Sequence, residues 1–395
     1  MVDSGSSTFV RSRLAVGALV IIVALGWVVH LQDRDGTHVS TRTGATTTVA
    51  PPNDPPASTA PPASGPTNIY AAAGANMLNP IVASVPYRIY VPDSAGSDVQ
   101  VIDPNTFKVI DTYTTGLDPQ HVVPAWDLRT LYAANTLANT LTPIDPVTGK
   151  PGKSIPVADP YNLYFTPDGS LAIVVAEAQK RLDFVDPHTF ATVQQVPVDC
   201  AGVDHVDFSA DGSFLIATCE FSARLVRVDV ATRKVTGYLD LAGSSPQDIK
   251  LDPTGRTFYV ADKNLGGVFT IDAATFTKTG FITTGIDTHG LYPSRDATQL
   301  YVSNRGSGSV TVIDFATNSI VARWDIPGGG SPDMGGVSPD GKVLWLSGRY
   351  DKAVYALSTT DGHLIAKVAV GDKPHGLCVW PQPGRYSLGH TGVMR

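Results

Sequence analysis

The chain has 395 residues, of which 43% are hydrophobic and 16% charged, and its formal net charge is -7. This composition excludes a disordered chain and a small disulfide scaffold, because the apolar fraction is ample for a large core. The 37 glycines and 30 prolines favour many turns between short strands. An acidic balance argues against nucleic acid as the main partner, because that affinity comes largely from clustered Lys and Arg.

The N-terminus has the pattern of an export signal. Residues 1–13 form a polar cytoplasmic region with Arg11 and Arg13, and residues 14–31 follow as a hydrophobic helix. Arginines before such a segment keep that end in the cytoplasm, so the rest of the chain is exported. Residues 14–31 are either a transmembrane anchor or a signal peptide, and the lack of a small-residue cleavage site directly after them favours the anchor. The predicted protein is membrane-anchored with an extracytoplasmic body, or secreted if the segment is cleaved.

Residues 32–69 are rich in Thr, Pro and Ala. Such a stretch has few apolar side chains to bury and predicts an extended linker. The linker would hold the rest of the chain away from the membrane.

A single pattern recurs seven times through residues 70–395. Its marker is an apolar pair followed by Asp, a turn and usually Thr, and successive copies are 41 to 44 residues apart. The marker residues are Asp103, Asp145, Asp186, Asp229, Asp272, Asp314 and, in a degenerate last copy, Ser358. A repeat of this length with Pro and Gly turns about every ten residues predicts four antiparallel strands, the unit of a β-propeller blade.

Residues 332–373 serve as the template of one blade. The expected strands are 334–338, 343–347, 353–357 and 364–370.

The ends of the array predict ring closure. The first copy, whose strand is expected at 88–91, lacks a leading strand, and residues 374–379 supply an extra one. We therefore expect an all-β, seven-bladed propeller of four-stranded antiparallel blades, closed by the C-terminal strand. Closure removes the free sheet edges that open sheets expose. Residues 381–395 lie outside the repeat and have no predicted place.

Residues 301–304, read Tyr-Val-Ser-Asn, and residues 310–314 resemble the YVTN repeat of seven-bladed propellers, including the YncE-like extracytoplasmic proteins. The likeness covers about residues 84–380. It implies the propeller fold and a binding or surface protein, because family members are mostly of these kinds. Distant relatives include lactonase-like propellers and the haem-carrying propeller of nitrite reductase, so an enzymatic or cofactor function stays open.

Because corresponding strands of all blades run in the same direction, equivalent positions of successive repeats lie on the same face of a propeller. First strands line the central channel, so residues at their starts converge on one channel mouth. Four histidines occupy such starts, two blades apart, and three aspartates lie at or beside the same positions. These residues are His121, His205, His289, His375, Asp204, Asp248 and Asp333.

A second ring is expected from the ends of second strands and the loops behind them. Its members are Glu177, Glu220, Asp262, Arg305 and Arg349. Together the two rings form a candidate ligand site. The four histidines could hold a metal or exchange protons near neutral pH, and the alternative is that these polar groups only solvate the mouth and cap strand ends.

Catalytic motifs are missing from the sequence. It contains no nucleophile elbow, no phosphate-binding loop and no local metal motif. A hydrolase triad could be composed of Ser331, Asp333 and His289 or His375, but no sequence motif supports this combination.

The three cysteines have separate expected roles. In an exported protein Cys200 and Cys219 are predicted to form a disulfide. Cys378 lies in an inner strand and is expected to be a buried core residue.

The sequence leaves three functions open. The favoured one is a monomeric, non-catalytic propeller that binds a small molecule, a glycan or a protein partner at the channel mouth. The second is an enzyme or a metal- or haem-binding propeller that uses the histidine ring. The third is a pure scaffold that binds through its blade rims.

Overall fold

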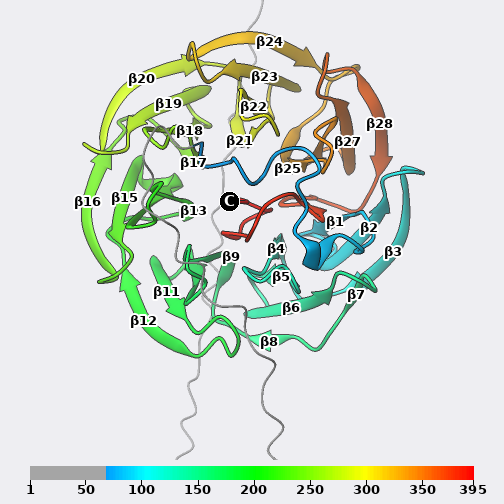
Figure 1. The fold of residues 1–395 in the computed structure, drawn as a ribbon, viewed down its shortest axis with the longest axis horizontal. Helices are drawn as coiled ribbons and strands as arrows, with labels where there is room; N and C mark the ends of the chain where they lie inside the picture. Colours follow the sequence, from blue (N-terminus) through cyan, green and yellow to red (C-terminus); the bar gives the residue numbers. More distant parts are fainter. Residues whose placement is uncertain (1–67) are drawn as a thin grey trace, which may run out of the picture. The chain divides into compact units, whose positions relative to one another are not determined.

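The computed structural model describes residues 68–395. Its strands form seven antiparallel sheets arranged as blades around a central axis (Figure 1), which confirms the predicted all-β seven-bladed propeller. The predicted segments 1–13 and 14–31 and the linker up to residue 67 lie outside the described residues. Within residues 68–395, no helix is long and apolar enough to cross a membrane.

Each blade runs from a first strand at the hub to a fourth strand at the rim. The first strands are β29 (Cys378–Trp380), β4 (Pro119–Pro124), β9 (Pro160–Phe165), β13 (Val203–Phe208), β17 (Pro246–Leu251), β21 (Thr288–Pro293) and β25 (Pro332–Val337). The second strands are β1 (Arg88–Asp93), β5 (Leu131–Asn135), β10 (Ala172–Ala176), β14 (Phe214–Cys219), β18 (Thr257–Asp262), β22 (Gln299–Asn304) and β26 (Val343–Gly348).

The outer half of each blade completes the sheet. The third strands are β2 (Asp98–Asp103), β6 (Thr140–Asp145), β11 (Arg181–Val185), β15 (Arg224–Asp229), β19 (Gly267–Asp272), β23 (Ser309–Asp314) and β27 (Ala353–Ser358). The rim strands are β3 (Lys108–Thr114), β7 (Lys150–Pro151), β8 (Ile155–Pro156), β12 (Thr192–Pro197), β16 (Lys234–Asp240), β20 (Thr277–Thr283), β24 (Ser319–Asp325) and β28 (Leu364–Ala369). Two short 3-10 helices are η1 (Pro80–Val82) and η2 (Glu220–Ser222).

Burial separates hub strands from rim strands. The hub strand β4 is buried at all six positions, whereas the rim strand β3 alternates between exposed and half-buried side chains. A half-buried strand alternates because successive side chains point to opposite faces. In the second blade the rim strand is split into β7 and β8, each ending in proline, which cannot donate a ladder hydrogen bond.

The ring closes as predicted. The strand β29 pairs antiparallel with β1, with Val379 opposite Ile89 and Cys378 opposite Tyr90. The C-terminal part of the repeat region thereby supplies the hub strand of the first blade and leaves no gap between the first and last blades. Cys378 is fully buried in this strand, as expected.

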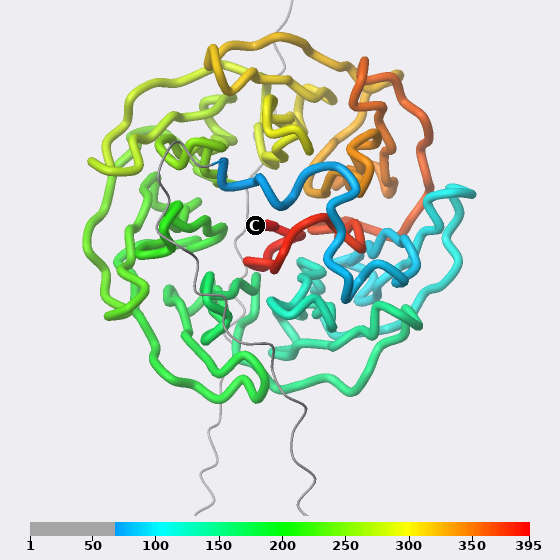
Figure 2. Tube along the Cα trace, viewed as in Figure 1, coloured from blue at the N-terminus to red at the C-terminus, as the bar shows by residue number. Residues whose placement is uncertain are grey.

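Two segments outside the repeat cover one end of the propeller, which we call the turn face because it carries the turns between first and second strands. Ile69 N donates to Pro253 O and Asn76 N donates to Pro339 O, both in these turns. In Figure 2 the N-terminal segment, in blue, and the C-terminal segment, in red, both cross the hub. The opposite end, where first strands begin, is the mouth face.

The C-terminal segment enters the channel itself. Residues 386–395 form a hairpin, here called the hub hairpin, in which Leu388 N donates to Val393 O. Its backbone also pairs with β9, because Phe165 N donates to Leu388 O. Gly389 has φ +99°, and a Cβ there would collide with the backbone of β9. The position of this segment could not be predicted from the sequence, and in the structure the segment forms part of the hub.

Candidate functional site

Five histidines meet on the axis of the propeller. Four are those expected to converge, and the fifth comes from the tip of the hub hairpin. Neighbouring rings have centroids 4.8 to 6.0 Å apart, and no ring is more than 3% exposed. This histidine cluster consists of His121, His205, His289, His375 and His390.

Two rings of the cluster are held at Nδ1 by β9. His121 Nδ1 lies 2.9 Å from the carbonyl oxygen of Tyr161. A carbonyl can only accept, so Nδ1 of His121 carries the proton and Nε2 keeps its lone pair. His390 Nδ1 lies 2.9 Å from the side-chain amide of Asn162, which joins the hub hairpin to the same strand.

Carboxylate oxygens lie within 3.0 Å of Nδ1 of the other three rings. His205 Nδ1 lies 2.9 Å from Asp204 Oδ1, outside hydrogen-bond angles. Asp333 Oδ2 is hydrogen-bonded to His375 Nδ1 at 2.6 Å, whereas its Oδ1 lies 3.0 Å from His289 Nδ1, whose hydrogen-bond partner is Met334 Sδ at 3.0 Å. Outer carboxylates of this kind orient imidazoles whose Nε2 binds a ligand or a metal.

Three Nε2 atoms of the cluster are buried without any hydrogen-bond partner. They belong to His121, His205 and His390. Nitrogen atoms of the same three rings lie within 4.8 Å of one another. Buried polar atoms are nearly always hydrogen-bonded in folded proteins, so three unpaired nitrogen atoms that converge on one point indicate a binding site for a ligand.

Burial keeps most of the cluster uncharged. It lowers the pKa of His121 and of His390 well below the ordinary histidine value, and the neighbouring histidines lower both further. His205 differs: burial also disfavours its charged form, but the Asp204 carboxylate reverses the shift and raises its pKa. The cluster therefore offers neutral imidazole lone pairs beside one buried carboxylate.

Two of the predicted aspartates are already satisfied by cations. Although burial alone would raise it, the pKa of Asp333 lies well below its ordinary value because of His289, His375 and Arg305. Asp248 Oδ1 accepts from Lys250 Nζ at 2.6 Å. Asp204 is the exception, since both of its oxygens are buried without a hydrogen-bond partner.

The mouth side of the cluster is covered by acidic and aromatic side chains. Tyr161 Oη lies 3.5 Å from His375 Nε2. Burial raises the pKa of Glu177 to about 8, and the charges of Asp204 and Glu220 add to the effect. Glu220 forms an ion pair of 3.2 Å with Lys263. A cation bound near these carboxyl groups would favour their ionised form.

The two predicted arginines differ in their availability to a ligand. Arg305 pairs with Asp287 at 2.9 Å and with Asp333 at 3.3 Å. Arg349 Nη1 lies 3.3 Å from the carbonyl oxygen of Lys373. Arg305 is thus tied to two carboxylates, whereas Arg349 forms no ion pair among the described residues and keeps its charge near His375.

Asp262 has a structural role at the end of β18. Its carboxylate accepts from Ser245 N and from Leu265 N, both at 2.7 Å. It therefore caps a loop rather than facing the cluster, in agreement with the alternative that some ring members cap strand ends.

The structure does not bring Ser331 and the histidines together as a hydrolase triad. Ser331 Oγ donates to Asp351 Oδ2 at 2.6 Å, while His289 and His375 share Asp333. No imidazole is therefore placed to take the proton of Ser331.

Cys200 and Cys219 form the expected disulfide, with their Cα atoms 6.0 Å apart. The bond joins the loop after β12 to the end of β14. It ties together two neighbouring blades on the mouth face.

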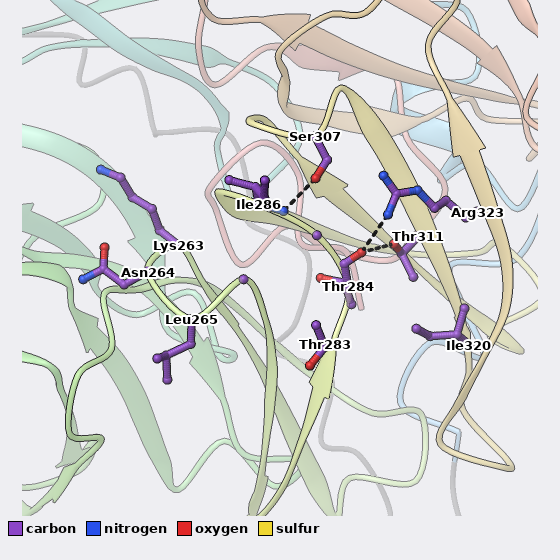
Figure 3. Close-up of a pocket in the computed structure, with 12 residues that line it drawn as sticks. Lys263, Asn264, Leu265, Thr283, Thr284, Ile286, Ser307, Thr311, Ile320 and Arg323 are labelled. Carbon is purple, nitrogen blue, oxygen red and sulfur yellow. Dashed lines mark hydrogen bonds between the residues drawn. The ribbon is translucent and has the colours of Figure 1, made fainter.

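A surface cavity of about 670 Å³ lies away from the hub, between the fifth and sixth blades (Figure 3). Leu265, Ile286 and Ile320 line it and are exposed. Thr311 Oγ1 and Arg323 both donate to the carbonyl oxygen of Thr284 at its floor. Its lining contains no histidine and no carboxylate, so it does not share the chemistry of the hub.

Sequence reasoning missed His390. The repeat places first-strand residues, and residues 381–395 belong to no repeat. The one available signal was local: Gly389 and Gly392 flank His390 and Thr391 between apolar residues, which is typical of a hairpin turn that presents its central residues.

The fold and the hub define the class of this protein: a closed seven-bladed propeller with a plugged channel and a polar mouth. The chain belongs to the YncE-like beta-propeller family, whose model matches residues 60–383. It is 23% identical over 279 residues to the uncharacterised protein YncE of Salmonella typhi and to that of Salmonella typhimurium. Each alignment covers 64% of this chain and 75% of the relative.

Solved structures show the same fold. Hydrazine synthase of Kuenenia stuttgartiensis superposes with a TM-score of 0.60 at 20% identity, covering 71% of this chain and 98% of that one. The dihydro-haem d1 dehydrogenase NirN superposes with a TM-score of 0.56 at 15% identity, covering 75% of each chain. At these identities the likeness concerns the fold alone.

Proposed function

We propose that this protein is an extracytoplasmic, non-catalytic binding protein that takes its ligand into the hub through the mouth face. The observation that carries the proposal is the convergence of buried, unpartnered polar atoms on the mouth side of a channel whose other end is filled. Residues 386–395 occupy the turn-face end. A ligand therefore has one side from which to approach.

The ligand is small. No ring of the histidine cluster is more than 3% exposed, and the side chain of Tyr161 packs against His121 and His205, with ring centroids 5.2 and 6.1 Å apart. A sugar or a peptide would need these side chains to move far, whereas an ion or a molecule of a few atoms would not.

Export is supported by two independent features. The hydrophobic segment 14–31 follows arginines, and the disulfide between Cys200 and Cys219 suits an oxidising compartment. A non-catalytic role is supported by Ser331, whose hydroxyl is bound to Asp351 and not to a histidine.

A thermal-shift screen of the full chain tests the proposal. The panel contains divalent cations, small organic acids, short oligosaccharides and peptides, and a ligand raises the melting temperature by mass action. Glu177→Lys on the mouth face should abolish the shift. Asp325→Lys, which makes the same charge change on the exposed rim strand β24, should keep it.

The screen also separates this function from a scaffold. A ligand whose shift survives Glu177→Lys but is lost on changes at the rim would overturn the proposal in favour of rim binding. The mature N-terminus, read by mass spectrometry of protein from the native host, would show whether segment 14–31 is retained.

A further inference from the structure

We propose that the hub binds a late first-row transition-metal ion through Nε2 of His121, His205 and His390. The inference rests on the proposed function and names its ligand class. Nitrogen atoms of the three rings lie within 4.8 Å of one another. Each of the three Nε2 atoms is buried and has no hydrogen-bond partner.

Imidazole nitrogen is a ligand that suits zinc, copper and nickel, whereas magnesium and calcium prefer oxygen. The three rings are fully buried, and three imidazole donors in a water-poor site favour a soft or borderline cation over a hydrated hard one.

The outer contacts fit metal ligation. Nδ1 of His121 donates a hydrogen bond to the carbonyl oxygen of Tyr161, and Asp204 Oδ1 lies 2.9 Å from Nδ1 of His205. A hydrogen-bond acceptor at Nδ1 fixes the ring and makes Nε2 more basic. For His390, ligation through Nε2 puts the proton on Nδ1, so a bound ion requires the Asn162 amide to turn its oxygen toward that ring.

The surrounding charges also fit a cation. Asp204 has two buried carboxylate oxygens without hydrogen-bond partners, while Asp333 and Asp248 are already paired with Arg305 and Lys250. Asp204 is thus the buried carboxylate left to balance a metal ion. His289 and His375 stand next to the three ligands, with ring centroids 6.0 Å from His205 and 5.0 Å from His121, and can complete the coordination.

The site has an unusual construction, because two ligands come from hub strands and the third from the hub hairpin. Metal binding should therefore stabilise the docked hairpin, and a displaced hairpin should weaken metal binding by the same free energy. Gly389→Ala probes this coupling without removing a ligand, because a Cβ at this residue collides with the backbone of β9.

The test uses the full chain, stripped with a chelator and dialysed against Zn²⁺ or Cu²⁺. Elemental analysis should find about one ion per chain, and affinity should fall by about 100-fold in the His121→Ala/His205→Ala double variant. The matched control is His188→Ala/His363→Ala, which removes two exposed histidines and should leave affinity unchanged.

A spectroscopic measurement covers the chance that the double variant does not fold. The electron paramagnetic resonance spectrum of the Cu²⁺-loaded protein should show nitrogen hyperfine splitting, and His390→Gln should reduce the number of coupled nitrogens. Gly389→Ala should weaken Zn²⁺ binding by about 10-fold or more. A wild-type chain that takes up neither ion overturns the metal proposal, as does equal uptake by the double variant and the control.

The two proposals fail differently. If neither metal binds but an organic ligand stabilises the wild type and not Glu177→Lys, the metal assignment is wrong and the mouth-face function stands. If Zn²⁺ stabilises the wild type and Glu177→Lys equally while His121→Ala/His205→Ala abolishes the effect, the metal site stands and the mouth-face route is wrong.

Discussion

The rim and the hub of the propeller use polar residues in opposite ways. At the rim, the marker aspartate of each repeat accepts hydrogen bonds from the turn that follows it. Asp229 Oδ1, for example, accepts from Thr232 N at 2.8 Å and from Thr232 Oγ1 at 2.6 Å. At the hub, His121 Nε2 and both oxygens of Asp204 are buried without a hydrogen-bond partner. The marker aspartates thus stabilise the turns of the blades, whereas polar atoms at the hub are left free for a ligand.

The pKa values of carboxyl groups show the same contrast between the rim and the mouth. Hydrogen bonds from Thr232 lower the pKa of Asp229, whereas burial raises the pKa of Glu177 to about 8 at the mouth. A satisfied carboxylate stabilises the fold when ionised, and a desolvated one opposes it. Mutations at the two places should therefore differ in sign as well as in size.

The largest expected effect is at the base of the hub hairpin. Arg395 Nη2 donates to Asp207 Oδ1 at 2.8 Å, and both side chains are buried. Arg395→Ala leaves a buried carboxylate without its cation, so the free energy of unfolding should fall by about 3 kcal/mol in a urea titration.

The control for this prediction is Arg323→Ala, which removes an exposed pair with Asp325 and should change stability by about 0.5 kcal/mol or less. Equal effects of the two substitutions would show that the hub hairpin adds nothing to the fold. The comparison between hub and rim would then fail at its strongest point.

The second prediction concerns Asp333, which accepts from His375 and Arg305 and lies 3.0 Å from His289 Nδ1. Asp333→Asn removes the negative charge beside both rings and leaves one acceptor oxygen, so His375 or Arg305 loses its hydrogen bond. If these rings complete the metal coordination, Zn²⁺ affinity should fall by about 10-fold to 100-fold. Asp340→Asn on the turn face is the control, and unchanged affinity in Asp333→Asn would confine the site to the other three histidines.

Much of the hub could be predicted because the constant repeat length identifies equivalent positions in every blade. Spacing by whole blades placed His121, His205, His289 and His375 at starts of first strands, and the structure brings them together. The blade boundaries followed from turn residues, and β25 to β28 lie within two residues of the expected strands.

The rest of the hub could not be predicted from the repeat spacing. His390 lies outside every repeat, so no periodicity could place it in the channel. The partner of His121 is a backbone carbonyl, which every residue possesses and no side-chain pattern reveals. Spacing also could not separate Asp262, which caps a loop through two backbone N–H groups, from Asp204, which has no such partners.

The third prediction exploits two equivalent residues at the ends of second strands. Asp93 is buried without hydrogen-bond partners, and burial together with the nearby Asp98 raises its pKa to about 8. Because the folded pKa is raised, the ionisation penalty is absent below the unfolded pKa of about 4 and complete above about pH 8. Asp93→Asn should therefore stabilise the fold by about 2 kcal/mol at pH 9 and much less at pH 4.

The matched substitution Asp262→Asn should stabilise the fold less than Asp93→Asn does at pH 9. Burial raises the pKa of Asp262 as well, but its two oxygens each accept a backbone N–H, and an amide can replace only one of them, so the loss of about 1 kcal/mol offsets the gain. Urea titrations of both variants at pH 4 and pH 9 check the pair. Destabilisation by Asp93→Asn at pH 9 would mean that the Asp93 carboxylate has a partner after all.

The smallest expected effect is at the rim. Hydrogen bonds from the backbone and hydroxyl of Thr189 lower the pKa of Asp186, so this carboxylate stabilises the fold above its unfolded pKa and loses that contribution as pH falls through the lower folded value. Because Asp186 is only half-buried, solvent screens the gain, and Asp186→Ala should cost about 0.5 kcal/mol at pH 7 and less at pH 3. The marker residue recurs in six of the seven repeats, yet each copy stabilises only its own turn. A cost as large as that of Arg395→Ala would show that the rim, and not the plugged hub, limits unfolding of the ring.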